Sequence, residues 1–195
     1  SMNYYNPWIE CATEETMHTM QGQRLHDMVE RCYHAVPFYK KKLDELGISP
    51  KDITSIDDIS KLPFTYKQDL RDNYPYGLLA VPRDQLVRIH ASSGTTGKMT
   101  VVGYTEKDLQ DWSEDTARAL VAAGAEKRDH VHIAYGYGLF TGGLGIHYGV
   151  ERLGATSIPV SSGNTQRQIS LLEDFEPDVI CCTPSYALYI AETML

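Results

Sequence analysis

The sequence has no long apolar run and is short of basic residues. None of its stretches reaches the ~20 apolar residues that a membrane-spanning helix requires, and no signal-peptide core follows the start. Only 18 Lys and Arg residues oppose 26 Asp and Glu, which gives a formal net charge of −8. Because nucleic-acid binders need a basic face toward the phosphate backbone, this balance argues against that class of partner. We therefore expect a cytoplasmic protein that binds neither membranes nor nucleic acids.

Cysteine is also scarce. Cys11, Cys32, Cys181 and Cys182 have neither the spacing of a zinc site nor the density of a secreted disulfide scaffold. Cys181 and Cys182 lie in an apolar run, where small core residues are expected, and no metal site is predicted. Ser1, which precedes Met2, is typical of a tag remnant and is set aside. A core is nevertheless available, because 42% of the 195 residues are hydrophobic.

The first region, residues 1–82, is predicted to be helical. Apolar side chains recur at three- and four-residue steps after Thr13, and a second helical pattern covers residues 37–47. A short helix is expected across 67–73, in a segment that several prolines punctuate. The only cationic run, 40–42, falls on the second helical pattern and is predicted to form a solvated helix face.

The second region, residues 83–195, is predicted to be α/β. The runs "QLVRIH" and "MTVVGY" favour strands on either side of a glycine-rich loop. Three further strand candidates, "HVHIAY", "ATSIPV" and "DVICCT", are separated by helical patterns, which predicts βαβ units with parallel strands. The last helix begins at Thr183 and still runs at Leu195, so we expect the N-terminal part of a longer protein.

The loop in "HASSGTTGKMTVVGYT", residues 90–105, is rich in groups that bind phosphate. Its hydroxyls and glycines bring several donors close to an anion, and Lys98 adds a point charge. The Walker pattern of nucleotide triphosphatases fails, because Ser92 stands at the first glycine of that motif and Met99 follows the lysine. On composition alone, a flexible hairpin connection remains the alternative.

The order of these residues carries a resemblance. "SSGTTGK", with "YTEKDL" opening a helix soon afterwards, resembles the phosphate loop of the adenylate-forming superfamily, which includes the acyl-coenzyme A synthetases. "HASSGTTGK", "VVGYT", "YGYGLFTGGLGIHYG", "LGATSIPVSSGNT" and "TPSY" together resemble the phenylacetate-coenzyme A ligase family, over nearly the whole chain. Met99 departs from the proline that this family usually has. The resemblance implies part of an adenylation enzyme's large N-terminal domain, without the C-terminal domain that carries a lysine.

The resemblance also implies a reaction. It implies an ATP-dependent ligase that joins phenylacetate to coenzyme A through an acyl-adenylate and releases AMP and pyrophosphate. ATP with Mg²⁺, coenzyme A and an aryl acid are the implied small molecules, and the family's habit suggests a homodimer. The implied phosphate-binding residues are Ser92, Ser93, Gly94, Thr95, Thr96, Gly97 and Lys98. Tyr135, Tyr137 and Phe140, which follow a predicted strand, are the implied walls of the aryl pocket.

Several alternatives stay open. One alternative to a ligase is a non-catalytic module that binds a phosphate-bearing ligand, and another is a structural fragment with incomplete sites. A third is a phosphotransferase, which the failed Walker pattern disfavours. The turn 161–164 is a second candidate anion site, although capping of the following helix explains it more simply. His147 is expected to be a satisfied core or surface residue rather than an acid–base catalyst and is left out of the site, and Tyr186 is expected to pack. No catalytic residue is assigned, and we expect no turnover by this chain alone.

Overall fold

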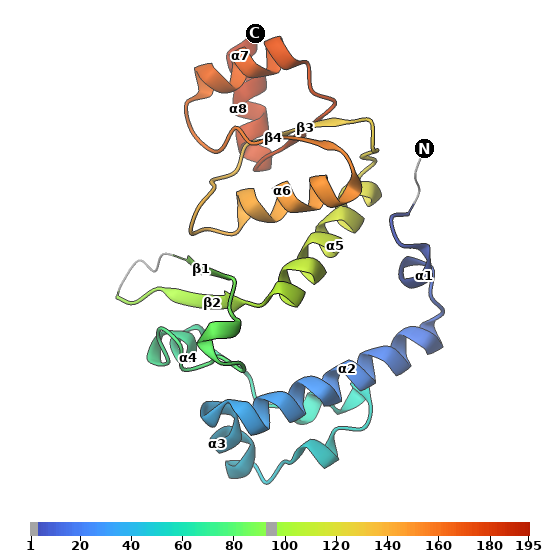
Figure 1. Cartoon of the computed structure of the whole chain (residues 1–195), viewed down its shortest axis with the longest axis vertical. Helices are drawn as coiled ribbons and strands as arrows, with labels where there is room; N and C mark the ends of the chain where they lie inside the picture. The colour runs from blue at the N-terminus through green and yellow to red at the C-terminus, as the bar shows by residue number, and fades with distance from the viewer. Residues whose placement is uncertain (1–3, 93–96) are drawn as a thin grey trace. The chain divides into compact units, whose positions relative to one another are not determined.

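Figure 1 shows the computed structural model of the chain, which describes residues 4–92 and 97–195. The chain forms two compact units, one of Pro7–Thr105 and one that combines Ser1–Asn6 with Glu106–Leu195. The first unit is therefore inserted, in sequence, between two segments of the second. The expected division into regions 1–82 and 83–195 stays a prediction.

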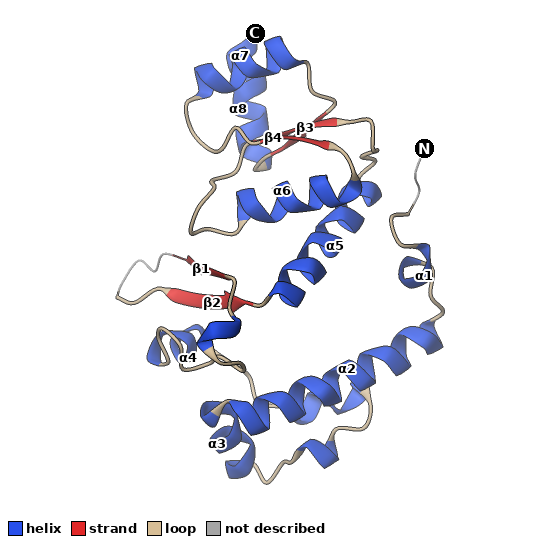
Figure 2. Ribbon diagram, viewed as in Figure 1, coloured by secondary structure: helices blue, strands red, loops and turns tan. Residues whose placement is uncertain are grey.

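The unit of residues 7–105 consists of helices and one β-hairpin (Figure 2). Its α-helices are α1 (Pro7–Glu10), α2 (Glu14–Ala35), α3 (Pro37–Glu45) and α4 (Lys67–Asp72). Its 3-10 helices are η1 (Pro50–Asp52), η2 (Ile56–Lys61) and η3 (Arg83–Gln85). The hairpin is formed by β1 (Arg88–Ser92) and β2 (Thr100–Tyr104). These elements confirm the predicted helical start of the chain and the predicted strands around the glycine-rich loop.

The long helix α2 begins where the sequence predicts it. The side-chain oxygen of Thr13 accepts a hydrogen bond from the backbone N–H of Thr16 at 3.1 Å, which satisfies one of the free donors of the first turn. The same helix buries Val29 against Leu43 of α3 and against Ile53. This cluster is the core of the unit, and each buried aliphatic side chain contributes about 1.5–3 kcal/mol.

The lysine run lies on α3. Lys40 and Lys41 are exposed and each faces a carboxylate four residues along the helix, as expected for a solvated face. Lys42 differs, because its ammonium is 3.5 Å from a carboxylate oxygen of Asp69 and donates to the carbonyl oxygen of Phe64 at 2.5 Å. Lys42 therefore ties α3 to the segment that carries α4.

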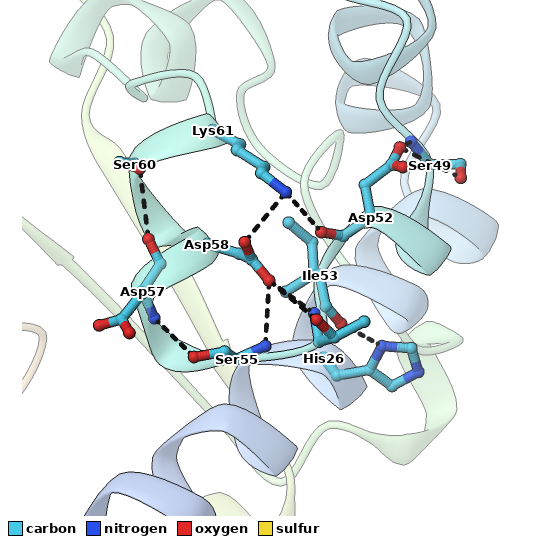
Figure 3. A network of polar contacts seen from close by, with 10 residues as sticks. His26, Ser49, Asp52, Ile53, Ser55, Asp57, Asp58, Ser60 and Lys61 are labelled. Atoms are coloured by element: carbon cyan, nitrogen blue, oxygen red, sulfur yellow. Dashed lines mark hydrogen bonds and ion pairs between the residues drawn. The ribbon is translucent and has the colours of Figure 1, made fainter.

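A carboxylate organises the start of η2 (Figure 3). Asp58 accepts hydrogen bonds from the backbone N–H groups of Thr54 at 2.8 Å and Ser55 at 3.0 Å, and the Lys61 ammonium lies 3.0 Å from its other oxygen. The Thr54 bond, the Lys61 bond and the Ser55 bond together hold the pKa of Asp58 well below its ordinary value. The turn before η2 is thus held by an ionised side chain.

The second unit is α/β. Its helices are α5 (Glu106–Ala122), α6 (Gly142–Leu153), α7 (Thr165–Phe175) and α8 (Pro184–Met194). Its strands β3 (His130–Ile133), β4 (Thr156–Ile158) and β5 (Val179–Cys181) are parallel and lie in the order β4-β3-β5, which confirms the predicted βαβ units. The two crossovers run in opposite directions across the sheet, so right-handed connections place α6 and α7 on opposite faces, as Figure 1 shows.

Helices α5 and α6 pack closely because glycines of α6 face larger side chains of α5. A Cβ atom at Gly145 would lie 2.5 Å from a ring carbon of Trp112, and one at Gly149 would lie 2.4 Å from the methyl carbon of Thr116. Neither glycine position therefore has room for a side chain. The core beneath these helices includes Val131 of β3, which is fully buried.

Residues 4–6 belong to the second unit. Tyr5 packs against its core, and its hydroxyl oxygen accepts a hydrogen bond from Nε of Arg152 at 3.3 Å. Asn6 donates from its side-chain amide to a carboxylate oxygen of Glu114 at 3.4 Å. The start of the chain is thus fastened to helices that follow much later in the sequence.

The two cysteines of the second unit, Cys181 and Cys182, are half-buried. Cys181, at the end of β5, packs against the core, and burial raises the pKa of its thiol. Burial also raises the pKa of the Cys182 thiol, so both side chains are protonated at neutral pH. Within residues 4–92 and 97–195, no helix has the length and apolar character needed to cross a bilayer.

Candidate functional site

The β1–β2 hairpin presents the hydroxyl-rich loop. The strands pair antiparallel in a register that ends with Ser92 opposite Thr100, and the hydroxyl groups of these two residues are hydrogen-bonded to each other. Ser93, Gly94, Thr95 and Thr96, four of the expected phosphate-binding residues, lie outside the described residues. A strand rather than a helix follows Lys98, which agrees with the exclusion of a Walker loop.

The hairpin is supported from within its own unit. His90 and Ala91 of β1 are buried, and the ring of Tyr104 meets the His90 ring edge to face with centroids 5.5 Å apart. Helix α4 packs against β2. Gly103 allows Leu86 to approach β2 closely, because a Cβ atom at that glycine would lie 2.9 Å from the leucine side chain. The loop is therefore carried by strands that rest on packed side chains.

The C-terminal side of the loop is exposed. Gly97 has a φ of 86°, a left-handed conformation that favours glycine. Lys98 is exposed, and its ammonium lies 6.0 Å from the centroid of the Tyr74 ring, within cation–π range. Met99 is 38% exposed. Among the described loop residues, Ser92 thus provides a hydroxyl group and Lys98 provides a positive charge. Gly97 adopts a left-handed backbone conformation between Ser92 and Lys98.

The expected aryl-pocket residues follow β3, at the C-terminal edge of the parallel sheet. Tyr135 and Tyr137 are half-buried and pack against the core of the second unit. A Cβ atom at Gly142 would lie 3.3 Å from Tyr135 atoms, and one at Gly143 would lie 2.7 Å from a ring carbon of Tyr137. Each tyrosine therefore lies against a glycine in the first turn of α6, whereas Phe140 is 51% exposed.

A residue that the sequence left out of the site contacts one of these tyrosines. Nδ1 of His147 is 3.2 Å from the Tyr137 hydroxyl, and its Nε2 is 2.8 Å from a carboxylate oxygen of Glu151. Burial and the Glu151 charge raise the pKa of Tyr137 to about 12. The four-residue spacing of His147 and Glu151 on one helix was the signal available in the sequence.

The second hydroxyl-rich turn, 161–164, acts as a helix cap. The side-chain oxygen of Asn164 accepts from the backbone N–H of Arg167 at 3.2 Å, so the simpler of the two expectations is confirmed. Tyr186 hydrogen-bonds to the Thr165 hydroxyl at 3.0 Å, in agreement with a packing role.

Proteins with closely similar sequences share one function. The chain is 54% identical over 188 residues to the phenylacetate-coenzyme A ligase of Thermus thermophilus and 54% identical over 186 residues to that of Escherichia coli. These matches cover 96% and 95% of this chain but 42% and 43% of the relatives, so the chain spans less than half of their length. No family model matches the chain.

Among solved structures, those of another CoA ligase have a similar fold. A 2-hydroxyisobutyryl-CoA ligase in complex with 2-HIB-AMP and CoA superimposes with a TM-score of 0.91 at 28% identity, over 98% of this chain and 42% of that chain. An open conformation of that ligase gives a TM-score of 0.90 at 27% identity, over 98% of this chain and 46% of that chain. By sequence, the chain is therefore similar to part of the phenylacetate-coenzyme A ligases, and by fold it is similar to part of an adenylate-forming CoA ligase.

Proposed function

We propose that this chain is the N-terminal part of an ATP-dependent ligase that joins phenylacetate to coenzyme A. The acid's carboxylate attacks the α-phosphate of Mg-ATP, pyrophosphate leaves, and the thiol of coenzyme A then displaces AMP from the acyl-adenylate. The observation that carries the proposal is the 54% identity to a phenylacetate-coenzyme A ligase across 96% of this chain. The hairpin that holds the hydroxyl-rich loop supports it further.

In this proposal the loop from Ser92 to Lys98 binds the β- and γ-phosphates of ATP. The Ser92 hydroxyl stands at the loop's entrance, where strand pairing ends, and the exposed Lys98 supplies a positive charge at its exit. Such groups stabilise the charge that develops on departing pyrophosphate and hold the α-phosphate in place, without covalent chemistry. Residues 93–96 of the loop enter the proposal from the sequence alone.

The proposed aryl pocket begins at the loop after β3. Tyr135 and Tyr137 supply two rings at the C-terminal edge of the sheet, the edge at which open α/β sheets bind ligands. The exposed ring of Phe140 is available to a ligand. A pocket of this kind distinguishes neighbouring aryl acids by about 1–3 kcal/mol per methylene. Phenylacetate is the proposed acid because the named relatives are phenylacetate ligases.

The remaining parts of the proposal concern the complete protein. Mg²⁺ enters as part of the substrate Mg-ATP, and coenzyme A is the second substrate. We place the protein in the cytoplasm, as a homodimer. The groups that bind adenine, ribose and coenzyme A are assigned to residues outside this chain, so the chain alone does not complete the reaction.

The test is phenylacetate-dependent exchange of labelled pyrophosphate into ATP. We expect exchange by the complete protein and none by the 195-residue chain. Lys98→Ala should raise the KM for ATP, whereas Lys107→Ala removes a lysine that is paired with Asp111 on α5 and should have no effect. If the complete protein shows no exchange but ATP raises its melting temperature, the result would instead support a non-catalytic binding module. Exchange by this chain alone would show that it holds a whole adenylation site.

A further inference from the structure

The hydrogen bonds around His147 have only one arrangement when its imidazole is neutral. A carboxylate accepts hydrogen bonds and donates none, so the contact with Glu151 places the ring proton on Nε2. Nδ1 is then an acceptor, and the Tyr137 hydroxyl must donate to it. Glu151 thus determines the direction in which the Tyr137 hydroxyl points. A carboxylate that orients a histidine, which in turn orients a working group, is a recurring arrangement in enzyme sites.

The Tyr137 ring is also restricted by shape. One of its ring carbons lies where Gly143 could not carry a side chain, so the ring rests directly on the backbone of α6. The His147 ring meets it edge to face, with centroids 5.7 Å apart and planes at 84°. Burial and Glu151 raise the pKa of the Tyr137 hydroxyl to about 12, so it stays protonated even at mildly alkaline pH. The tyrosine therefore remains a hydrogen-bond donor over the working range of an enzyme.

We propose that His147 and Glu151 are positioning residues for Tyr137 in the aryl-acid pocket, and that both act through the tyrosine hydroxyl. The inference rests on the proposed function, in which Tyr137 is a wall of that pocket. A wall residue that is held by its own hydroxyl keeps one ring orientation, so the pocket is formed before the acid binds. The pair has no proposed contact with ATP, and its removal is expected to affect the binding of the acid alone.

The variants separate this role from general stability. His147→Phe keeps an aromatic ring and removes both hydrogen bonds, and Glu151→Leu removes the acceptor that orders them. Glu151→Gln keeps an acceptor oxygen for His147, so its KM for phenylacetate should stay near that of the parent protein. The matched control is Glu30→Leu, because Glu30 faces His26 on α2 with the same four-residue spacing and a separation of 3.5 Å.

In the complete protein, His147→Phe and Glu151→Leu should raise the KM for phenylacetate by about three- to tenfold, the effect of one hydrogen bond. The KM for ATP and kcat should stay within about twofold, and Glu30→Leu should match the parent protein. In a Tyr137→Phe background, His147→Phe should have no further effect, because the hydroxyl through which it acts is gone. Additive effects in the double variant, or equal changes in both KM values, would overturn the inference.

A second measurement does not depend on activity. In the complete protein labelled with ¹⁵N-histidine, the His147 signals, assigned by their loss in His147→Phe, should show a protonated Nε2 and an unprotonated Nδ1 at pH 8. Glu151→Leu should abolish this preference. The opposite tautomer would overturn the inference even in an active enzyme. A parent protein with the expected tautomer but no phenylacetate-dependent exchange would contradict the proposed function instead.

Discussion

His132 and Gln168 form a buried hydrogen bond of 2.6 Å between Nε2 of the imidazole and Oε1 of the amide. His132 lies in β3 and is fully buried, and Gln168 lies in α7 and is 1% exposed. The amide nitrogen of Gln168 donates to the carbonyl oxygens of Ser161 at 2.8 Å and Gly163 at 3.1 Å. One glutamine side chain therefore links the central strand to the turn that leads into α7.

Replacement of Gln168 by leucine should be strongly destabilising. The change leaves the buried His132 N–H without its acceptor, which costs about 1–3 kcal/mol, and it also removes the hydrogen bonds to two carbonyl oxygens of the preceding turn. We expect the free energy of unfolding in urea to fall by at least about 2 kcal/mol. Gln166 lies on the same helix and is exposed, so Gln166→Leu should change the free energy of unfolding by less than about 0.5 kcal/mol. Equal effects of the two substitutions would disprove the role of the buried amide.

Asp58→Asn should destabilise the unit of residues 7–105 in a pH-dependent way. The pKa of Asp58 is lower in the folded chain than its value of about 3.9 when unfolded, so its stabilisation is fully present above that pH. The stabilisation is lost as the pH falls toward the folded pKa. We therefore expect the difference between parent and variant in thermal melts to be large at pH 7 and smaller at pH 3. Asp57→Asn is the control, because that carboxylate is 82% exposed, and it should melt like the parent.

Tyr137→Phe should change the response of the chain to alkaline pH. The folded pKa of about 12 exceeds the value of about 10 expected in the unfolded chain, so the unfolded state loses its proton first. The contribution of Tyr137 to the free energy of unfolding therefore decreases as the pH rises from about 10 to 12. Urea unfolding across this range should show a shallower decline for the phenylalanine variant, with pH 7 as the reference. Identical slopes for the two proteins would contradict the raised pKa.

Gly149→Ala should be destabilising although alanine is the better helix former. The helix preference favours alanine by about 1 kcal/mol, but the new methyl group would overlap the Thr116 side chain on α5. Overpacking of this kind costs about 1–3 kcal/mol, so the clash is expected to dominate in calorimetric melts. Thr116→Ala should recover part of the loss when combined with Gly149→Ala. A double variant as unstable as the sum of its parts would mean that the contact is not the cause.

Local patterns predicted the elements of this fold, because their causes are local. The Thr13 cap, the proline at the start of α3 and the alternation of short strands with helices each leave a mark within a few residues. The contact of Tyr137 with His147 has no such mark. It depends on how the loop after β3 returns to α6, and the sequence therefore favoured an ordinary core or surface histidine outside the site. Its spacing from Glu151 was visible, but that spacing is equally typical of a solvated helix face.

The attachment of Tyr5 to the second unit determines the order in which the chain can fold during synthesis. Tyr5 leaves the ribosome before residues 7–105, whereas Arg152 and the core against which it packs follow them. The inserted unit is continuous in sequence and can complete its contacts first, since domains generally fold as units as they emerge. The N-terminal segment must wait until its partners after residue 105 have been made, so loss of residues 4–6 would affect the unit that is completed after the inserted one.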